Sequence, residues 1–150
     1  GALGVVDWLV KPIDEDRLMT AMARAVLTSP GRATRILHVE DDPDLQRVVA
    51  AIVDREALIE QALNLAEARE RLMGGHFDLV ILDLALPDGS GLELLPELGS
   101  LDPPTPVLIF SAHEVDKTVA GRVAAVLVKS QTSNRELSER IRSALQGSSR

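Results

Sequence analysis

The chain has 150 residues, 45% of them hydrophobic, which is enough for one domain whose core must be aliphatic, because only one Trp and two Phe are present. The formal net charge of −7 at pH 7 argues against direct nucleic-acid binding, which usually uses a clustered basic surface. The absence of cysteine excludes disulfides and thiolate metal sites, and no apolar run approaches the ~20 residues of a membrane span.

The beginning of the chain resembles its end. The run WLVK at residues 8–11 matches VLVK at residues 126–129, and a helical apolar pattern follows each run. We therefore expect the chain to start with the truncated strand–helix end of a preceding, related domain. The expected divisions are this truncated unit, a linker, a complete domain and a short tail, at residues 1–27, 28–33, 34–147 and 148–150. The helix of the truncated unit has an unpartnered apolar face, so we expect it to pack on a neighbour, as in a homodimer.

Short apolar runs alternate with helical patterns through the rest of the chain. Strands are predicted at residues 35–40, 56–61, 78–82, 106–110 and 123–128. Helices are predicted at residues 43–55, 63–73, 92–98 and 113–121, and after Ser133, which has the spacing of a capping box with Glu136. The strands are continuously apolar, which is typical of a parallel sheet covered on both faces. The prediction is an α/β fold with a doubly wound, five-stranded parallel sheet in three layers.

Charged and polar residues follow four of the predicted strands, in the order Asp41 and Asp42, Asp83, Ser111, and Lys129. In such sheets ligands bind beyond the carboxyl ends of the strands, so we expect these side chains to meet at one edge. Three carboxylates there would repel one another by roughly 3 kcal/mol per pair at about 5 Å, which a bound Mg²⁺ would relieve. A lysine ammonium and a serine hydroxyl can each hold a phosphoryl oxygen, so the set suits phosphoryl transfer onto a carboxylate.

Each of these residues also has a purely structural explanation when it is taken alone. The acids before Pro43 are suitable helix caps, and Asp83 precedes a turn-forming sequence with Pro87. Ser111 and Lys129 alone would be ordinary surface or capping residues. Their joint order on alternating strands is what favours a functional site.

Four motifs of the chain together resemble the receiver domain of two-component response regulators. They are VEDD at residues 39–42, LDLALPDGSG at 82–91, Ser111-Ala112, and Lys129. The resemblance implies a flavodoxin-like (βα)5 fold in which Asp83 takes up a phosphoryl group from a histidine kinase or a histidine phosphotransfer domain. It also implies that the domain catalyses its own phosphorylation and dephosphorylation.

The same resemblance implies a role for each site residue. Asp41, Asp42 and Asp83, with the backbone carbonyl of Ala85, would hold Mg²⁺. Ser111 would supply a switch hydroxyl, and Lys129 would be the charge partner. The truncated unit resembles the end of a second receiver, so the expected context is a hybrid sensor histidine kinase in the cytoplasm, with no nucleic-acid or membrane contact by this fragment.

The chain departs from the usual receiver at three points. Ser130 replaces a common proline after Lys129, and Val126 replaces a common aromatic residue. The interval from Ser111 to Lys129 is also a few residues short, which predicts a shortened fourth helix.

Two other functions are compatible with the sequence. One is a binding module that keeps the fold without being phosphorylated. The other is a Mg²⁺-dependent aspartyl-phosphate phosphatase, which would need a general acid two residues after the nucleophile, where this chain has Ala85.

Overall fold

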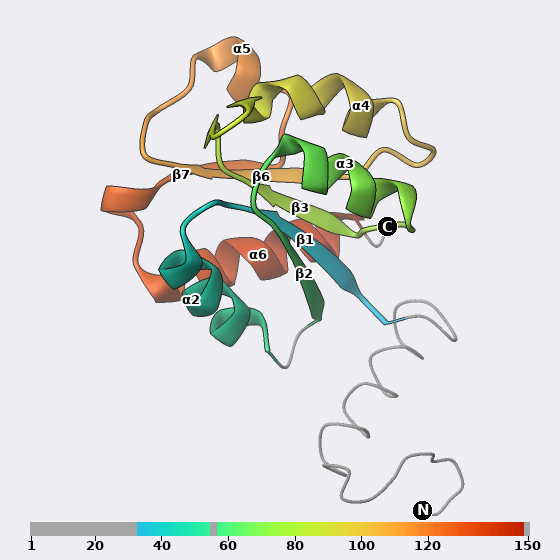
Figure 1. Ribbon diagram of the computed structural model, residues 1–150. Coiled ribbons are helices and arrows are strands. Elements are labelled where there is room, and N and C mark those ends of the chain that lie inside the picture. The colour runs from blue at the N-terminus through green and yellow to red at the C-terminus, as the bar shows by residue number, and fades with distance from the viewer. Residues whose placement is uncertain (1–32, 55–56, 149–150) are drawn as a thin grey trace, which may run out of the picture.

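The computed structural model describes residues 33–54 and 57–148, which form a parallel sheet between two layers of helices (Figure 1). The five strands of the sheet are β1 (Arg35–Val39), β2 (Leu58–Ala62), β3 (Leu79–Leu82), β6 (Val107–Ser111) and β7 (Ala125–Val128). Their order across the sheet is β2-β1-β3-β6-β7, with every pairing parallel. This confirms the predicted doubly wound α/β fold, and each strand overlaps its predicted range.

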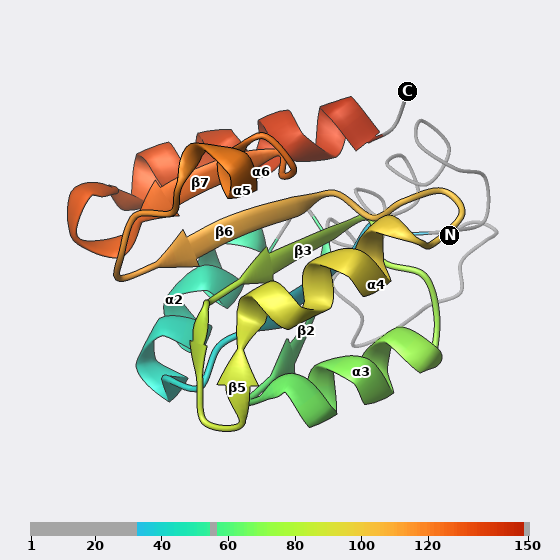
Figure 2. The same cartoon turned by 90° about the horizontal axis from the view of Figure 1, so that it is seen from above.

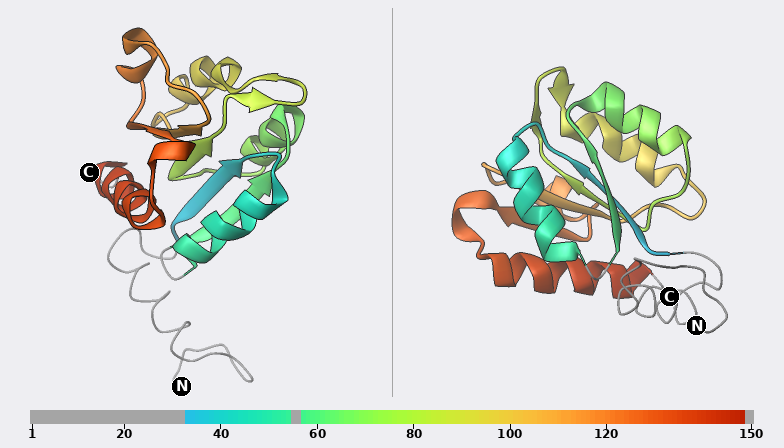
Figure 3. Two further views of the ribbon diagram at one scale, coloured as in Figure 1. Left: turned by 90° about the vertical axis from the view of Figure 1, so that its left-hand side faces the viewer. Right: turned by 60° about the horizontal axis from the view of Figure 1, so that its bottom comes forward.

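Helices cover both faces of the sheet, as Figures 1 and 2 show. Their bounds are α2 (Pro43–Val53), α3 (Leu65–Met73), α4 (Leu95–Gly99), α5 (Lys117–Ala120) and α6 (Asn134–Ser148), with 3-10 turns η1 (Gly91–Leu94) and η2 (Lys129–Gln131). Helices α2 and α6 lie on one face, and α3, α4 and α5 on the other (Figure 3). The expected N-cap of the last helix is confirmed, because the hydroxyl of Ser133 accepts the N–H of Glu136 at 3.1 Å.

The core consists of two apolar clusters, one on each face of the sheet. Successive residues of a strand point to opposite faces, so Leu37 of β1 belongs to the cluster under α3 and α4, and Ile36 to the cluster under α2 and α6. All residues of β3 and β6 are buried. These two central strands therefore fix the position of whatever follows their carboxyl ends.

Two elements of the fold are short. Helix α5 has only four residues, which confirms the predicted shortening. A hairpin of β4 (Ala85–Leu86) and β5 (Gly89–Ser90), where the sequence predicted only a loop, follows β3.

Asp102–Pro103 is the only cis peptide bond in the described ranges, so the bond between Lys129 and Ser130 is trans.

Residues 1–27 and the expected linker up to Arg32 lie outside the residues that the structure describes. The truncated preceding domain and the homodimer expected through it therefore stay predictions. Within the described ranges, no helix has the length and apolar character that crossing a membrane would require.

Replacing Leu37 by alanine tests the burial of β1 in the interior of the sheet. The side chain is fully buried, so Leu37→Ala should lower the free energy of unfolding by about 2–5 kcal/mol, through lost apolar contact and a residual cavity. Leu58→Ala in edge strand β2 is the matched control, because its side chain is 60% exposed and its loss should be much smaller. Urea unfolding followed by circular dichroism gives both values, and equal losses would contradict the described core.

Candidate functional site

Three acids and one lysine meet at the carboxyl end of the sheet. Glu40, Asp41 and Asp83 place carboxylate oxygens within 4.8 Å of one another. The Nζ of Lys129 lies 3.1 Å from Oδ2 of Asp83, to which it donates a hydrogen bond, and 2.9 Å from Oε1 of Glu40. The predicted convergence of Asp41, Asp83 and Lys129 is therefore observed.

The sheet register produces this arrangement. Val39 of β1 pairs with Leu82 of β3, and the N–H of Asp83 donates to the carbonyl of Val39 at 3.0 Å. The residues that follow these two strands are consequently side by side. Lys129 reaches them from β7, two strands away from β3, because its side chain is long enough to cross β6.

Two of the three acids are buried and the third is exposed to solvent. The residues Glu40 and Asp83 are 1% and 4% exposed, whereas Asp41 is exposed. Burial raises the pKa of Glu40 to about 7, against the opposing effect of Lys129. Burial would lower the pKa of Lys129, but the interactions of its ammonium with the carboxylates of Glu40 and Asp83 outweigh this effect, and the pKa of Lys129 is raised. One ammonium therefore faces more negative charge than it can balance.

Such a site fits a hard divalent cation. Its donors are all carboxylate oxygens, which Mg²⁺ prefers, and the exposed Asp41 leaves a side open to water. A cation there would favour the ionised form of Glu40, which burial otherwise disfavours. Glu40, Asp41 and Asp83 are therefore the residues whose geometry suits metal binding.

Asp42 lies next to this cluster but is not a member of it. Its Oδ1 accepts the N–H of Asp44 at 2.9 Å and caps α2, while its own N–H donates to Oε2 of Glu40 at 3.2 Å. Glu40 was not among the residues predicted for the site. The sequence did contain a signal for this, because a proline at the first helical position makes the preceding residue, Asp42, the N-cap. The two acids that face the site are then the two before Asp42, namely Glu40 and Asp41.

Ser111 and Ala85 flank the cluster. Ser111 is the last residue of β6, is 2% exposed, and pairs in register with Val128, the residue before Lys129. The N–H of Ala85 donates to Oδ1 of Asp83 at 3.2 Å. All the predicted site residues thus lie at the same edge of the sheet, and the two carboxylate oxygens of Asp83 have different partners.

Comparison with known proteins agrees with this geometry. A family described as the response regulator receiver domain matches residues 36–142. The chain belongs to this family. The fold is accordingly that of a flavodoxin-like receiver, and the protein contains a receiver domain of two-component response regulators.

Relatives with known names include both regulators and sensors. The response regulator protein PilR of Pseudomonas aeruginosa is 39% identical over 80 residues, which are 53% of this chain and 18% of PilR. The sensor protein TorS of Escherichia coli is 32% identical over 94 residues, 61% of this chain and 10% of TorS. The chain thus spans less than a fifth of either relative.

Solved structures share the receiver fold. The response regulator protein TrrA of Thermotoga maritima, crystallised in complex with Mg²⁺-BeF, is 28% identical, with a TM-score of 0.65. The match covers 74% of this chain and 98% of that one.

The raised pKa of Glu40 should make the stability of the receiver depend on pH. The folded chain keeps the Glu40 proton up to about pH 7, whereas the unfolded chain loses it near the ordinary value of 4.5. Because the folded state binds more protons in this window, the free energy of unfolding should fall as pH rises from 4.5 to 7.

Glu40→Gln removes the carboxyl group and with it the pH-dependent contribution of Glu40 to the free energy of unfolding. In buffer with EDTA, the variant should gain stability relative to the natural chain as pH rises through this window. Urea unfolding of both chains at pH 5, 6, 7 and 8 measures the difference, and a constant difference would contradict the assignment.

Proposed function

We propose that this receiver takes a phosphoryl group from a phosphohistidine onto Asp83, with Mg²⁺ bound, as one step of a two-component phosphorelay. The observation that carries the proposal is the meeting of Asp83 with Glu40, Asp41 and the ammonium of Lys129. A nearly buried carboxylate with a cation 3.1 Å away is an oriented nucleophile, and catalysis of phosphoryl transfer is mainly positioning and electrostatics.

In this proposal Asp41, Asp83 and Glu40 hold the metal, and the backbone carbonyl of Ala85 is a further ligand. Asp42, expected as a ligand from the sequence, instead serves as the cap of α2. When bound, Mg²⁺ neutralises charge on the transferred phosphoryl oxygens. The likeness to TrrA, which was crystallised in complex with Mg²⁺-BeF, supports metal binding by this chain.

The chain's own residues then have distinct tasks. An oxygen of Asp83 forms the new bond to phosphorus while the bond from phosphorus to the histidine nitrogen breaks, and the electron pair returns to the imidazole. The ammonium of Lys129 balances the charge of the acyl phosphate, and the hydroxyl of Ser111 donates to one of its oxygens. The N–H of Ala85 orients Oδ1 of Asp83 before transfer.

The proposed partners are a histidine kinase or a histidine phosphotransfer domain, in the cytoplasm and without direct nucleic-acid binding. A hybrid sensor histidine kinase is the proposed parent protein. The likeness to the sensor protein TorS supports this context, and so does the four-residue helix α5, which leaves little helical surface between β6 and β7 for an output domain.

The two alternative functions make different use of the same site. A phosphatase would need a proton donor near the leaving group, and the methyl side chain of Ala85, two residues after Asp83, cannot supply one. A module that is not phosphorylated would keep the fold but would not react at Asp83.

Incubation with acetyl phosphate and Mg²⁺, followed by intact mass measurement, separates these functions. The natural chain should gain one phosphoryl group, and Asp83→Ala should gain none, because it lacks the acceptor oxygen. Turnover of added phosphoesters would favour the phosphatase. An unmodified natural chain, after treatment with a range of phosphohistidine donors as well, would contradict the proposal.

The neighbouring aspartates 41 and 42 provide a matched test of the metal site. Asp41→Asn should raise the Mg²⁺ dissociation constant at least about tenfold, because it removes a ligand charge. Asp42→Asn should leave the constant nearly unchanged, since that side chain caps α2. Isothermal titration calorimetry measures both constants, and a larger effect at Asp42 would restore it as a ligand in place of Glu40.

A further inference from the structure

The hairpin β4–β5 connects the phosphoacceptor to a part of the fold that lies outside the site. It starts two residues after Asp83, with Ala85 pairing with Ser90, and the N–H of Gly91 closes it on the carbonyl of Leu84 at 2.9 Å. Gly91 packs so closely that an added Cβ would lie 2.2 Å from the carbonyl oxygen of Asp83. The hairpin therefore contacts Asp83 from both of its ends.

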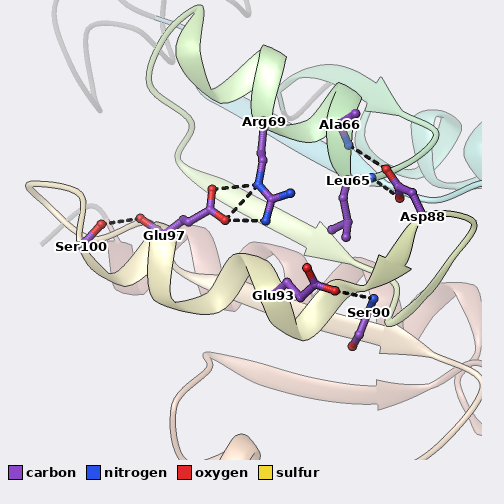
Figure 4. Close-up of polar contacts among 8 residues, drawn as sticks. All are labelled: Leu65, Ala66, Arg69, Asp88, Ser90, Glu93, Glu97 and Ser100. Atoms are coloured by element: carbon purple, nitrogen blue, oxygen red, sulfur yellow. Dashed lines mark hydrogen bonds and ion pairs between the residues drawn. The ribbon is translucent and has the colours of Figure 1, made fainter.

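The tip of the hairpin is bound to the first turn of α3 by Asp88. Its Oδ1 accepts the N–H of Leu65 at 2.8 Å, and its Oδ2 accepts the N–H of Ala66 at 3.1 Å, as Figure 4 shows. The first N–H groups of a helix have no partner within it, and the helix dipole favours a carboxylate there. The bonds from Leu65 and Ala66 lower the pKa of Asp88, so this carboxylate is charged at neutral pH.

Packing reinforces this attachment. Gly89, at the tip of the hairpin, has a φ of 149°, a conformation that residues with side chains rarely adopt. A Cβ at Gly89 would lie 2.9 Å from Cδ1 of Leu65. The tip thus contacts the start of α3 through both its backbone and the side chain of Asp88.

Helix α3 is itself held in place on the sheet. Leu65 and Ala68 are buried in the core cluster under this face. The guanidinium of Arg69 donates from Nε and Nη2 to the carboxylate of Glu97 in α4, with the Nη2 bond at 2.7 Å (Figure 4). These contacts hold α3 against the sheet and α4, so the bonds from its first turn to Asp88 hold the tip of the hairpin in place.

We propose that Asp88 is a positioning residue for phosphoryl acceptance: by tying the hairpin to α3, it holds the backbone of Ala85 against the carboxylate of Asp83. This inference rests on the proposed function, because it assigns Asp88 a part in that same site. Asp88 touches neither the metal nor the phosphoryl group. It acts through the Ala85 N–H, which fixes Oδ1 of Asp83, and through the Ala85 carbonyl, the proposed metal ligand.

Three substitutions test this role. Asp88→Ala removes both bonds to α3, Asp88→Asn keeps one acceptor oxygen without the charge, and Asn64→Ala is the control. Asn64 caps the same helix by accepting the N–H of Glu67 at 2.8 Å, so this cap bonds within α3 and not to the hairpin. Loss of either cap should weaken α3, whereas only loss of Asp88 should release the hairpin.

Two measurements are made on the full chain: the Mg²⁺ dissociation constant by calorimetry, and the exchange of the Ala85 and Gly91 amides by NMR. Asp88→Ala should raise the constant about tenfold, as loss of an orienting partner commonly does. It should also speed exchange of the Gly91 amide. Asp88→Asn should have a smaller effect on both, and Asn64→Ala should leave both close to those of the natural chain.

Equal changes in Asp88→Ala and Asn64→Ala would assign the effect to the stability of α3 and overturn the positioning role. Equal changes of the Mg²⁺ constant in Asp88→Ala and Asp88→Asn, with the Gly91 exchange unchanged in both, would show that the charge acts through space, which also overturns it. If the natural chain binds no Mg²⁺ and accepts no phosphoryl group, the proposed function fails. The amide exchange then still decides whether Asp88 holds the hairpin.

Discussion

The site depends on a charge imbalance that the fold itself creates. Two carboxylates that are almost fully removed from water, those of Glu40 and Asp83, share the single ammonium of Lys129. Buried acids in this state are costly, because desolvation disfavours their ionised form and each repels the other. The raised pKa of Glu40 relieves part of this cost through protonation. The adjacent Asp41 is open to solvent, so the proposed divalent cation would have a route to both buried acids.

The central strands hold these charged side chains close together. All residues of β3 are buried, and the bond from the Asp83 N–H to the carbonyl of Val39 fixes the end of β3 beside the end of β1. Moving Asp83 away from Glu40 would therefore require breaking sheet hydrogen bonds and exposing core leucines. The apolar core thus holds charges together that would otherwise separate.

The sequence was sufficient to predict the sheet and the set of strand ends, because continuous apolar runs and their spacing determine both. The apolar pattern alone did not decide which of three successive acids would face the site, because the end of β1 and the start of α2 are only a few residues apart. Asp42 and Glu40 differ in that Asp42 directly precedes Pro43, and a helix-capping argument would have separated them. The hairpin after Asp83 has only two residues in each strand, too short for any periodicity to show.

The charge state of His38 also matters for the proposed chemistry. His38 lies on β1, two residues before Glu40, and the charges of Lys129 and Asp83 both act on its ring. Burial lowers the pKa of His38 to about 4, and the ring is therefore uncharged at neutral pH. A protonated imidazole there would add a second positive charge near the acids and reduce their attraction for a metal. With His38 neutral, the positive charge in contact with Glu40 and Asp83 is that of Lys129. The remaining negative charge favours the proposed divalent cation, which would in turn attract the anionic phosphoryl group.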